Sequence, residues 1–402
     1  MIKNNSYDFA IVGSGILGVS VAFHLQLANP KARIILLEKE SEAFLHQTSH
    51  NSGVIHSGVY YQPGSLKSEF CKEGLKKTYE FSQKYNIKYN KCGKLIVATS
   101  ASEQDHLHKL FQNGLTNELP IKLLSQKQVK KIEPNLNSIE AILSPETGII
   151  DWKDFAKKML SIFQTNGGFF SNNFFVNQID ESDEGIILNS QQSAPVRAKK
   201  MIACGGLQAD RLARMLGLKP RLKIIPFRGD YFKLKDNFNH LFNHLIYPVP
   251  DNEVPFLGIH FTKTINNLMT LGPNATINFS REKYGRLSLD FVDMIDYLSF
   301  RGFWKLLNSH KMFVMNEFLT SLSKRYYLKH CKKYYSGLTV GDLLPYRSGI
   351  RAQAVLEDGS IMNDFYFENT KNALFVINAP SPAATSSIPI GQYVANKILE
   401  DF

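Results

Sequence analysis

Residues 7–38 read YDFAIVGSGILGVSVAFHLQLANPKARIILLE, and this stretch decides the fold of the N-terminal part of the chain. A β-rich run, Tyr7–Val12, leads into Gly-Ser-Gly-Ile-Leu-Gly, which matches the pattern GxGxxG. Helical spacing follows over Val19–Leu27, and Arg33–Leu37 is continuously apolar, like a strand buried in a parallel sheet. The order predicts a strand–turn–helix–strand unit of the dinucleotide-binding kind.

Each glycine of the turn has its own task in such a unit. Gly13 permits the tight turn, Gly15 lets backbone amides approach a pyrophosphate, and Gly18 allows helix and strand to pack closely. Glu38 follows about twenty residues later, where a carboxylate can hold ribose hydroxyls and repel a 2′-phosphate. NADP is therefore disfavoured, and the unit alone leaves FAD and NAD open. The cofactor contacts predicted here are Gly13, Gly15, Ile16, Leu17, Gly18, Glu38 and Lys39.

The overall composition is that of an ordinary globular protein. The 402 residues suffice for two packed domains, and the formal net charge is +11 at pH 7. That charge can attract anionic substrates, nucleic acid or anionic lipid, although scattered charge more often serves solubility. Four cysteines without CxxC or metal-ligand spacing predict reduced thiols and no metal site. The start of the chain does not look like a leader and no apolar run has bilayer length, so we expect a cytoplasmic protein.

The pattern along the rest of the chain predicts a discontinuous arrangement. Parallel α/β character occurs at both ends, whereas residues 220–280 alternate like an antiparallel sheet. We expect an α/β fold with a Rossmann-like FAD or NAD domain made of residues 1–90, 148–220 and 345–402. An antiparallel-sheet substrate domain is expected over residues 91–147 and 221–344, with a helical segment near 289–335. Phe169–Val176 and Gly185–Leu188 are expected to form a hairpin-like excursion.

A second stretch, HQTSHNSGVIHSGVYYQPGSLK at residues 46–67, carries a more specific signal. It resembles the corresponding loop of the L-2-hydroxyglutarate oxidases, also called dehydrogenases, which are relatives of D-amino-acid oxidase, glycine oxidase and glycerol-3-phosphate dehydrogenase. The resemblance continues at residues 91–99, 226–232, 243–250, 255–260, 271–275, 349–354 and 378–385, and thus spans nearly the whole chain. Asp230 and Ser49 depart from the family pattern, in which Glu and Gly are expected.

The resemblance implies a two-domain FAD-dependent oxidoreductase of the D-amino-acid-oxidase type. It implies oxidation of L-2-hydroxyglutarate to 2-oxoglutarate, with a hydride passing to the flavin and electrons passing on to membrane quinone or to oxygen. An amino-acid or amine oxidase of the same superfamily is the nearest alternative. A nucleic-acid-binding or tRNA-modifying protein is not expected, because no RNA-binding motif is present and no ordered basic stripe lies outside residues 300–333.

Three further segments are expected to contact the cofactor. Gly205 and Gly206 end an apolar run and would let the chain pass close to the adenosine. Hydroxyl and amide groups for the pyrophosphate and the flavin ring are offered by Thr48, Ser49, Asn51, Ser52 and the adjoining Gly53. The loop before the last helix would bring amides to a flavin carbonyl and stabilise negative charge there. That loop consists of Ala379, Pro380, Ser381, Pro382, Ala383, Ala384 and Thr385.

A dicarboxylate substrate carries two negative charges, and arginine pairs with carboxylates through a planar fork that stays protonated. Arg351 is the first candidate for this contact, because related oxidases hold the substrate carboxylate at this position. Arg228 is the second, and an ion pair with a nearby acid is the alternative for both.

Oxidation at C2 also requires a base for the hydroxyl proton, and histidine has a suitable intrinsic pKa. His56 and His260 are the candidates, with a purely structural role as the alternative. Tyr60, Tyr61 and Tyr247 offer hydroxyls to a carboxylate, although aromatic rings in such positions equally often serve packing.

Residues 300–333 combine cations and aromatic rings with a single acid, Glu317. The cations are Arg301, Lys305, Lys311, Lys324, Arg325, Lys329, Lys332 and Lys333, and the rings are Phe300, Phe303, Trp304, Phe313 and Phe318. Such a mixture is typical of surfaces that meet anionic lipid, and it predicts peripheral contact with the inner membrane. A solvated helical excursion is the alternative.

Overall fold

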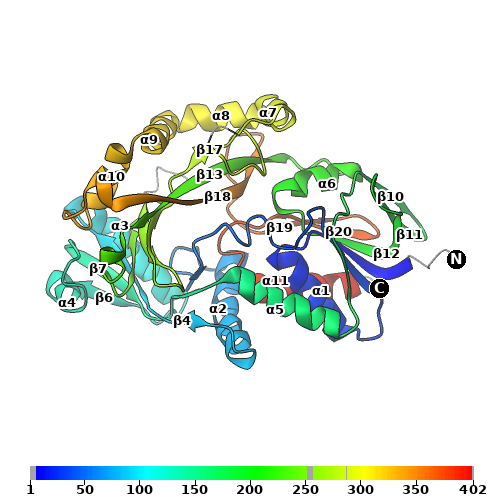
Figure 1. The fold of residues 1–402 in the computed structure, drawn as a ribbon, viewed down its shortest axis with the longest axis horizontal. Helices are drawn as coiled ribbons and strands as arrows, with labels where there is room; N and C mark the ends of the chain where they lie inside the picture. The colour runs from blue at the N-terminus through cyan, green and yellow to red at the C-terminus, as the bar shows by residue number, and fades with distance from the viewer. Residues whose placement is uncertain (1–5, 251–256, 287, 401–402) are drawn as a thin grey trace.

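The structure is a computed structural model that describes residues 6–250, 257–286 and 288–400. These residues form three sheets with helices packed around them. Figure 1 shows the sheet that contains the N-terminal strand at one end of the molecule and the second large sheet at the other. The predicted strand Phe256–Phe261 begins outside the described residues.

The first sheet has eight strands and is built around the N-terminal unit. Its parallel strands lie in the order β9, β2, β1, β12, β20, with β19 antiparallel to β20 and a hairpin, β10–β11, paired with the first half of β12. The strands are β1 (Ser6–Val12), β2 (Ile34–Leu37), β9 (Phe169–Ser171), β10 (Gln178–Ser182), β11 (Gly185–Asn189), β12 (Val196–Ala203), β19 (Tyr366–Asn369) and β20 (Ala373–Asn378).

Strand β1 lies in the middle of this sheet and is covered on both faces. Phe9 and Ile11 point into a core shared with α1 (Ile16–Ala28), α5 (Trp152–Thr165) and α11 (Ser387–Glu400). Ala10 and Val12 point into the opposite core, shared with β10, β11 and α6 (Ala209–Met215). From Phe9 to Val12 the strand is therefore buried on both faces, with side chains that alternate between the two cores, as in a parallel sheet covered on both sides.

The pairing predicted between Phe169–Val176 and Gly185–Leu188 is wrong. Phe169–Ser171 is instead the parallel edge strand β9, which pairs with β2. Residues 185–189 do form a hairpin, but their partner is β10. A three-residue strand pairs with whichever sheet edge is left open by tertiary packing. That edge cannot be predicted from the apolar pattern of the sequence.

The second large sheet has nine strands, of which β13, β14, β15 and β18 supply residues that line the site described below. Its order is β17, β13, β16, β15, β14, β5, β7, β6, with β18 paired to β13. The strands are β5 (Lys94–Ala98), β6 (Lys122–Ser125), β7 (Glu140–Ser144), β13 (Leu222–Leu234), β14 (Leu245–Pro248), β15 (His260–Lys263), β16 (Met269–Gly272), β17 (Thr276–Ile277) and β18 (Leu343–Leu356). A third, small sheet contains β3 (Val54–Ile55), β8 (Gly148–Ile150) and β4 (Tyr89–Asn90).

Strands β13 and β18 form a long antiparallel ribbon that joins the two large sheets. It pairs Leu222 with Leu356 at one end and Leu234 with Leu343 at the other. The first end packs into the core of the first sheet, and the second end packs into the core of the second.

We propose that the boundaries predicted from the sequence divide the chain into a nucleotide domain and a substrate domain. All strands of the first sheet lie within the residues assigned to the nucleotide domain, namely 1–90, 148–220 and 345–402. The nine-stranded sheet lies within 91–147 and 221–344, except that β18 continues to Leu356 because it pairs with β13 along its length.

The remaining helices cover the outer surfaces. They are α2 (Leu66–Lys84), α3 (Ala101–Thr116), α4 (Gln126–Ile132), α7 (Phe291–Leu298), α8 (Arg301–Ser309), α9 (Lys311–Leu322) and α10 (Lys324–Lys332), with short 3₁₀ turns at Gly206–Gln208, Asp236–Phe238 and Val340–Asp342. Helices α7 to α10 form an arc along the outside of the β13–β18 ribbon in Figure 1, which confirms the predicted helical segment near 289–335. Among the described helices, none combines the length and apolar character that a bilayer span requires.

Candidate active site

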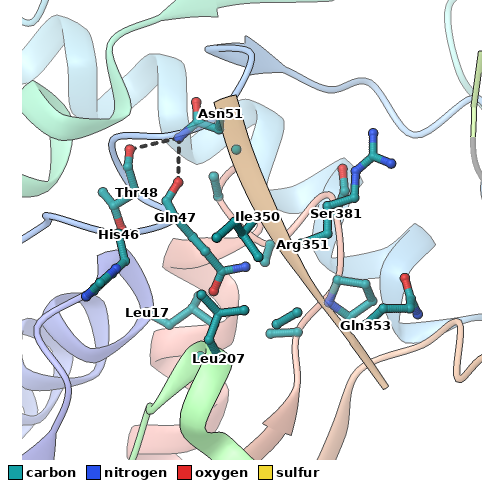
Figure 2. A pocket seen from close by; sticks show the side chains of 18 of the residues that line it. Leu17, His46, Gln47, Thr48, Asn51, Leu207, Ile350, Arg351, Gln353 and Ser381 are labelled. Atoms are coloured by element: carbon teal, nitrogen blue, oxygen red, sulfur yellow. Dashed lines mark hydrogen bonds between the residues drawn. The ribbon is translucent and has the colours of Figure 1, made fainter. Parts of the chain in front are cut away.

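A cavity of about 1490 Å³ is lined by residues of both large sheets. Its volume exceeds the roughly 300–1,000 Å³ of ordinary ligand pockets, as expected for a site that takes a dinucleotide together with a substrate. The lining begins at the glycine-rich turn between β1 and α1 and extends to β14, β15 and β18. Figure 2 shows part of it, from Leu17 to Ile350 and Arg351.

The glycine-rich turn leaves open space on the side of the cavity. A Cβ atom at Gly13, whose φ is +99°, would lie 2.5 Å from the Cys204 carbonyl oxygen, and one at Gly18 would lie 1.8 Å from the Gly13 carbonyl oxygen. At Gly15 the nearest atom to such a Cβ is Thr48 Oγ1, at 3.6 Å. Gly13 and Gly18 are thus required by packing, whereas Gly15 faces an open approach that suits a pyrophosphate at the N-terminus of α1.

Glu38 ends β2 as a buried carboxylate that lines the cavity. Its Oε2 accepts hydrogen bonds from the backbone N–H of Ser14 at 2.9 Å and from Ser14 Oγ at 2.6 Å, and its Oε1 accepts one from the N–H of Glu40 at 3.0 Å. These contacts fix the carboxylate beside the glycine-rich turn, where ribose hydroxyls would lie. Gly205 also lines the cavity, as do Ile16 and Leu17.

Three potential metal ligands, Glu40, His46 and Glu282, lie close together near the same end of the cavity. A cation of the protein itself already pairs with them. Lys39 Nζ lies 2.9 Å from Glu282 Oε2 and 3.2 Å from His46 Nε2, and it also contacts Glu40. The Lys39 ammonium group therefore occupies the position beside these three side chains and compensates the charge of the two carboxylates.

The loop at residues 46–53 is fixed onto the first turn of α1. Thr48 Oγ1 accepts a hydrogen bond from the backbone N–H of Ile16 at 3.0 Å. Asn51 Nδ2 donates to the carbonyl oxygens of Gln47 and Thr48, at 3.0 and 2.8 Å, as drawn in Figure 2. Asn51 and Thr48 line the cavity together with Ser52.

Two residues predicted in this loop do not line the cavity. Ser49 Oγ donates to the Phe44 carbonyl oxygen, and Gly53, at a φ of +70°, accepts a hydrogen bond from the Ile150 N–H at 2.8 Å through its carbonyl oxygen. Their contacts shape the loop, and a direct contact of either with a cofactor stays a prediction.

The loop between β20 and α11 forms another wall of the cavity. The lining includes all seven predicted residues of this loop, namely Ala379, Pro380, Ser381, Pro382, Ala383, Ala384 and Thr385. Thr385 Oγ1 accepts a hydrogen bond from the backbone N–H of His56 at 3.0 Å. This bond ties the C-terminal loop to the segment that follows β3, so both segments meet at the same part of the cavity.

The substrate-site candidates come together at this end. His56, Tyr60, Tyr247, His260 and Arg351 all line the cavity. The rings of Tyr247 on β14 and His260 on β15 are stacked, with centroids 3.9 Å apart and an interplanar angle of 7°. His260 Nδ1 lies 3.0 Å from Thr262 Oγ1. Neighbouring strands thus hold an imidazole against an aromatic ring in one orientation.

Both candidate histidines are held in the neutral form. Burial lowers the pKa of His56 to about 3, and the positive charges of Lys94 and Lys67 act in the same direction. Burial also lowers the pKa of His260 well below its usual value, with Arg351 and other cations adding to the effect. A neutral imidazole can accept a proton, as a general base must.

Arg351 and Arg228 differ sharply in their surroundings. Arg351 lines the cavity from β18 (Figure 2). Burial lowers the pKa of the Arg351 guanidinium, but the intrinsic pKa of arginine is high enough to keep the charge. Arg228 does not line the cavity, and its Nη2 lies 2.6 Å from Asp230 Oδ1. The structure thus shows for Arg228 the ion pair that was the alternative reading, and a substrate contact by Arg228 stays a prediction.

Several residues at this end of the cavity were not singled out from the sequence. Gln353 and Tyr231 line it, and Gln353 lies two positions after Arg351 on β18, so the period of two would have placed both on one face. Lys67 lines it as well, and Lys94 lies against the rings of Tyr60 and Tyr247. Both lysines lie in stretches that carried the family resemblance, and a lysine that opens the apolar run KLIVA was a readable signal for Lys94.

Comparison with known proteins gives consistent results. The chain matches the family model DAO, described as FAD dependent oxidoreductase, over residues 8–397. L-2-hydroxyglutarate dehydrogenase of Escherichia coli (strain K12) is 43% identical over 392 residues, which cover 98% of this chain and 93% of the relative. The mitochondrial L-2-hydroxyglutarate dehydrogenase of Homo sapiens is 38% identical over 417 residues, which cover 100% and 90%.

Solved structures with similar folds include two oxidases. Dithionite-reduced L-alpha-glycerophosphate oxidase from Mycoplasma pneumoniae, with FAD bound, has a TM-score of 0.80 at 21% identity, covering 98% of this chain and 95% of that one. Glycine oxidase from Geobacillus kaustophilus has a TM-score of 0.72 at 16% identity, with coverages of 98% and 95%. These matches confirm the predicted D-amino-acid-oxidase type of fold.

Proposed function

The chain belongs to the DAO family of FAD-dependent oxidoreductases and, within it, to the L-2-hydroxyglutarate dehydrogenases, and from this premise we propose that it oxidises L-2-hydroxyglutarate to 2-oxoglutarate. The observation that carries the proposal is the lining of one cavity. It joins the glycine-rich turn and Glu38 to neutral histidines and to the cation Arg351. A dinucleotide and an anionic hydroxy acid can therefore meet there.

The residues divide the chemistry between binding and proton transfer. Bound FAD supplies the acceptor for the hydride that leaves C2. Arg351 pairs with the carboxylate next to C2 and so orients the substrate. His260 takes the proton of the 2-hydroxyl: with Nδ1–H donating to Thr262 Oγ1, its Nε2 keeps a lone pair for this proton. His56 lines the same cavity and is the other candidate base.

Anaerobic reduction tests the proposed function directly. Mixing the oxidised holoprotein with L-2-hydroxyglutarate should bleach the flavin absorbance, whereas the D-enantiomer and amino acids should leave it unchanged. Reoxidation of the bleached protein, separately with air and with a short-chain quinone, then identifies the electron acceptor. Bleaching by an amino acid but not by L-2-hydroxyglutarate would contradict the proposal and favour the amine-oxidase alternative.

We also propose that a surface on α7, α8 and α9, here called the arc surface, meets anionic lipid and that membrane quinone receives the electrons. Its exposed apolar side chains are Phe291, Val292, Ile295, Trp304, Met312, Met315, Phe318, Leu319 and Leu322. Exposed cations beside them include Arg301, Lys311, Lys324 and Arg325. Phe303 is buried against Tyr297, so this predicted ring does not belong to the surface. Large exposed apolar patches bordered by charge mark interaction sites, and each basic residue near an anionic membrane adds about 1 kcal/mol.

Vesicle binding tests the arc surface. The holoprotein should float with anionic phospholipid vesicles at low salt, and should bind neutral vesicles and anionic vesicles at high salt much less. Replacing Met312 and Met315 with Glu should abolish flotation, since both side chains are exposed, at 76% and 56%. Leu115→Glu is the matched control, because Leu115 is an exposed apolar residue on α3. Equal flotation of both variants, or none by the wild type, would count against the lipid contact.

A further inference from the structure

Lys94 is a completely buried cation without a matching negative charge. It opens β5, and no described residue forms a hydrogen bond or an ion pair with its Nζ. The Nζ lies 4.6 Å from the centroid of the Tyr60 ring and 5.1 Å from that of the Tyr247 ring, and both rings line the cavity. A buried ammonium group is costly unless an anion or a set of acceptors compensates its charge.

Lys67 is a second cation in the same region. It lines the cavity from the first turn of α2, and its Nζ lies 5.2 Å from the centroid of the Tyr61 ring. Burial lowers the pKa of Lys67, and Asp364 is the acid whose negative charge opposes this larger effect. The Asp364 carboxylate, however, accepts hydrogen bonds from the backbone N–H groups of Leu66, Lys67 and Phe365, at 3.0, 2.9 and 2.8 Å. Among the described residues, no carboxylate lies within 4.0 Å of Lys67 Nζ.

The two lysines act on the same neutral neighbours. Both positive charges contribute to the lowered pKa of His56, after burial. The Cys71 thiol, which both lysines also influence, stays protonated, because burial raises its pKa to about 12. Burial lowers the pKa of each lysine to about 8, so both are largely protonated at pH 7. This part of the cavity therefore has a net positive charge that its own residues do not balance.

The order of strands separates this positive region from Arg351. Arg351 is on β18 and Lys94 on β5, and the strands that carry His260 and Tyr247 lie between them in the nine-stranded sheet. The charges of both Arg351 and Lys94 reach His260. Two cationic positions thus flank the stacked Tyr247–His260 pair, as a diacid with its reacting carbon near His260 requires.

Building on the proposed function, we propose that Lys67 and Lys94 form a second anion subsite, which binds the substrate carboxylate remote from C2. Lys67 contacts this carboxylate from the cavity wall. Lys94 is a positioning residue, since it holds the Tyr60 and Tyr247 rings from behind and adds its charge to the subsite. Arg351 binds the other carboxylate. The subsite makes the protein select dicarboxylates over monocarboxylates of equal length.

Product binding by the oxidised holoprotein tests the subsite without turnover. Dissociation constants are measured from the change in flavin absorbance for 2-oxoglutarate and for 2-oxopentanoate, which lacks the remote carboxylate. The wild type should prefer the diacid by about 100-fold, the range of charge-assisted pairs in buried sites. Lys67→Met should reduce that preference to about 2-fold and Lys94→Met to about 10-fold, with the affinity for 2-oxopentanoate unchanged. Lys109→Met, at an exposed lysine that also lines the cavity, should leave the preference intact.

If these lysines were merely structural, their loss would lower the affinity for both acids equally. An unchanged preference for 2-oxoglutarate over 2-oxopentanoate in Lys67→Met therefore contradicts the subsite. The same result in Lys94→Met removes Lys94 from it, and if that variant does not fold, Lys67→Met decides alone. Failure of the proposed function gives a different result, because L-2-hydroxyglutarate would then not bleach the wild-type flavin, and the subsite would fall with it.

Discussion

Replacing Arg351 with methionine is expected to lower kcat/KM for L-2-hydroxyglutarate by about 100- to 1,000-fold while FAD stays bound. Arg351 lines the cavity from β18, and methionine keeps an unbranched apolar side chain but removes the guanidinium and its charge. Loss of one partner of a buried, charged pair costs about 2–5 kcal/mol, or roughly 30- to 4,000-fold, and the expected decrease lies within this range. Steady-state assays with a dye acceptor give kcat/KM, and the ratio of flavin to protein absorbance gives the FAD content.

Arg228→Met is the matched control, because Arg228 lies on the neighbouring strand opposite Ile350 and does not line the cavity. Its loss should leave Asp230 without its partner at 2.6 Å and lower the melting temperature, with less than about a 10-fold change in kcat/KM. Similar kinetic losses in the two variants would mean that Arg351 acts through the stability of the ribbon and does not contact the substrate.

Gly18→Ala is expected to abolish FAD binding. An alanine Cβ there would lie 1.8 Å from the carbonyl oxygen of Gly13, which is backbone and cannot rotate away. The contact is relieved only if α1 separates from the glycine-rich turn, and that movement removes the amides that face the pyrophosphate. The purified variant should be colourless, or should fail to accumulate as folded protein.

Gly341→Ala is the control for this substitution. Gly341 is exposed, and the nearest atom to its added Cβ is 3.8 Å away, an ordinary contact distance. It should retain the FAD content and melting temperature of the wild type. A yellow Gly18→Ala protein with normal FAD content would show that the turn tolerates the shift and that cofactor binding depends on other contacts.

Local chemistry explains which features the sequence reveals. The glycine-rich turn, α1, β2 and Glu38 are predictable because each follows from neighbouring residues: a glycine where a Cβ collides, a helix by spacing, an acid at a strand end. The stretch at 46–67 adds the flavin family through a specific pattern of residues with little periodicity. The structure of these segments can be predicted with little knowledge of distant parts of the chain.

Features that depend on distant packing were predicted less well. The partner of β9 was wrong because the open edge of β2 is a property of the assembled sheet. The resemblance ranked Arg351 ahead of Arg228 as a substrate contact, but only the folded structure shows Arg351 in the cavity and Arg228 paired with Asp230. Phe303 looked like a membrane-facing ring, but the orientation of α8 buries it. Lys94 was not singled out although it opens an apolar run, and the enclosure of its charge by two rings exists only after folding.

The ribbon of β13 and β18 also limits how the molecule can move. One of its ends is built into the core around the nucleotide unit and the other into the core of the second sheet, and Arg351 lies on it in between. The ladder has one irregularity, between Asp230 and Phe232. A hinge between the two halves would have to bend the ladder or slip its register, and a slip by one residue turns every side chain to the opposite face. The ribbon therefore resists relative movement of the two halves and supports Arg351 between them. Entry and exit of small molecules then fall to loops and side chains at the rim of the cavity, and the alignment of the reacting groups is set when the chain folds.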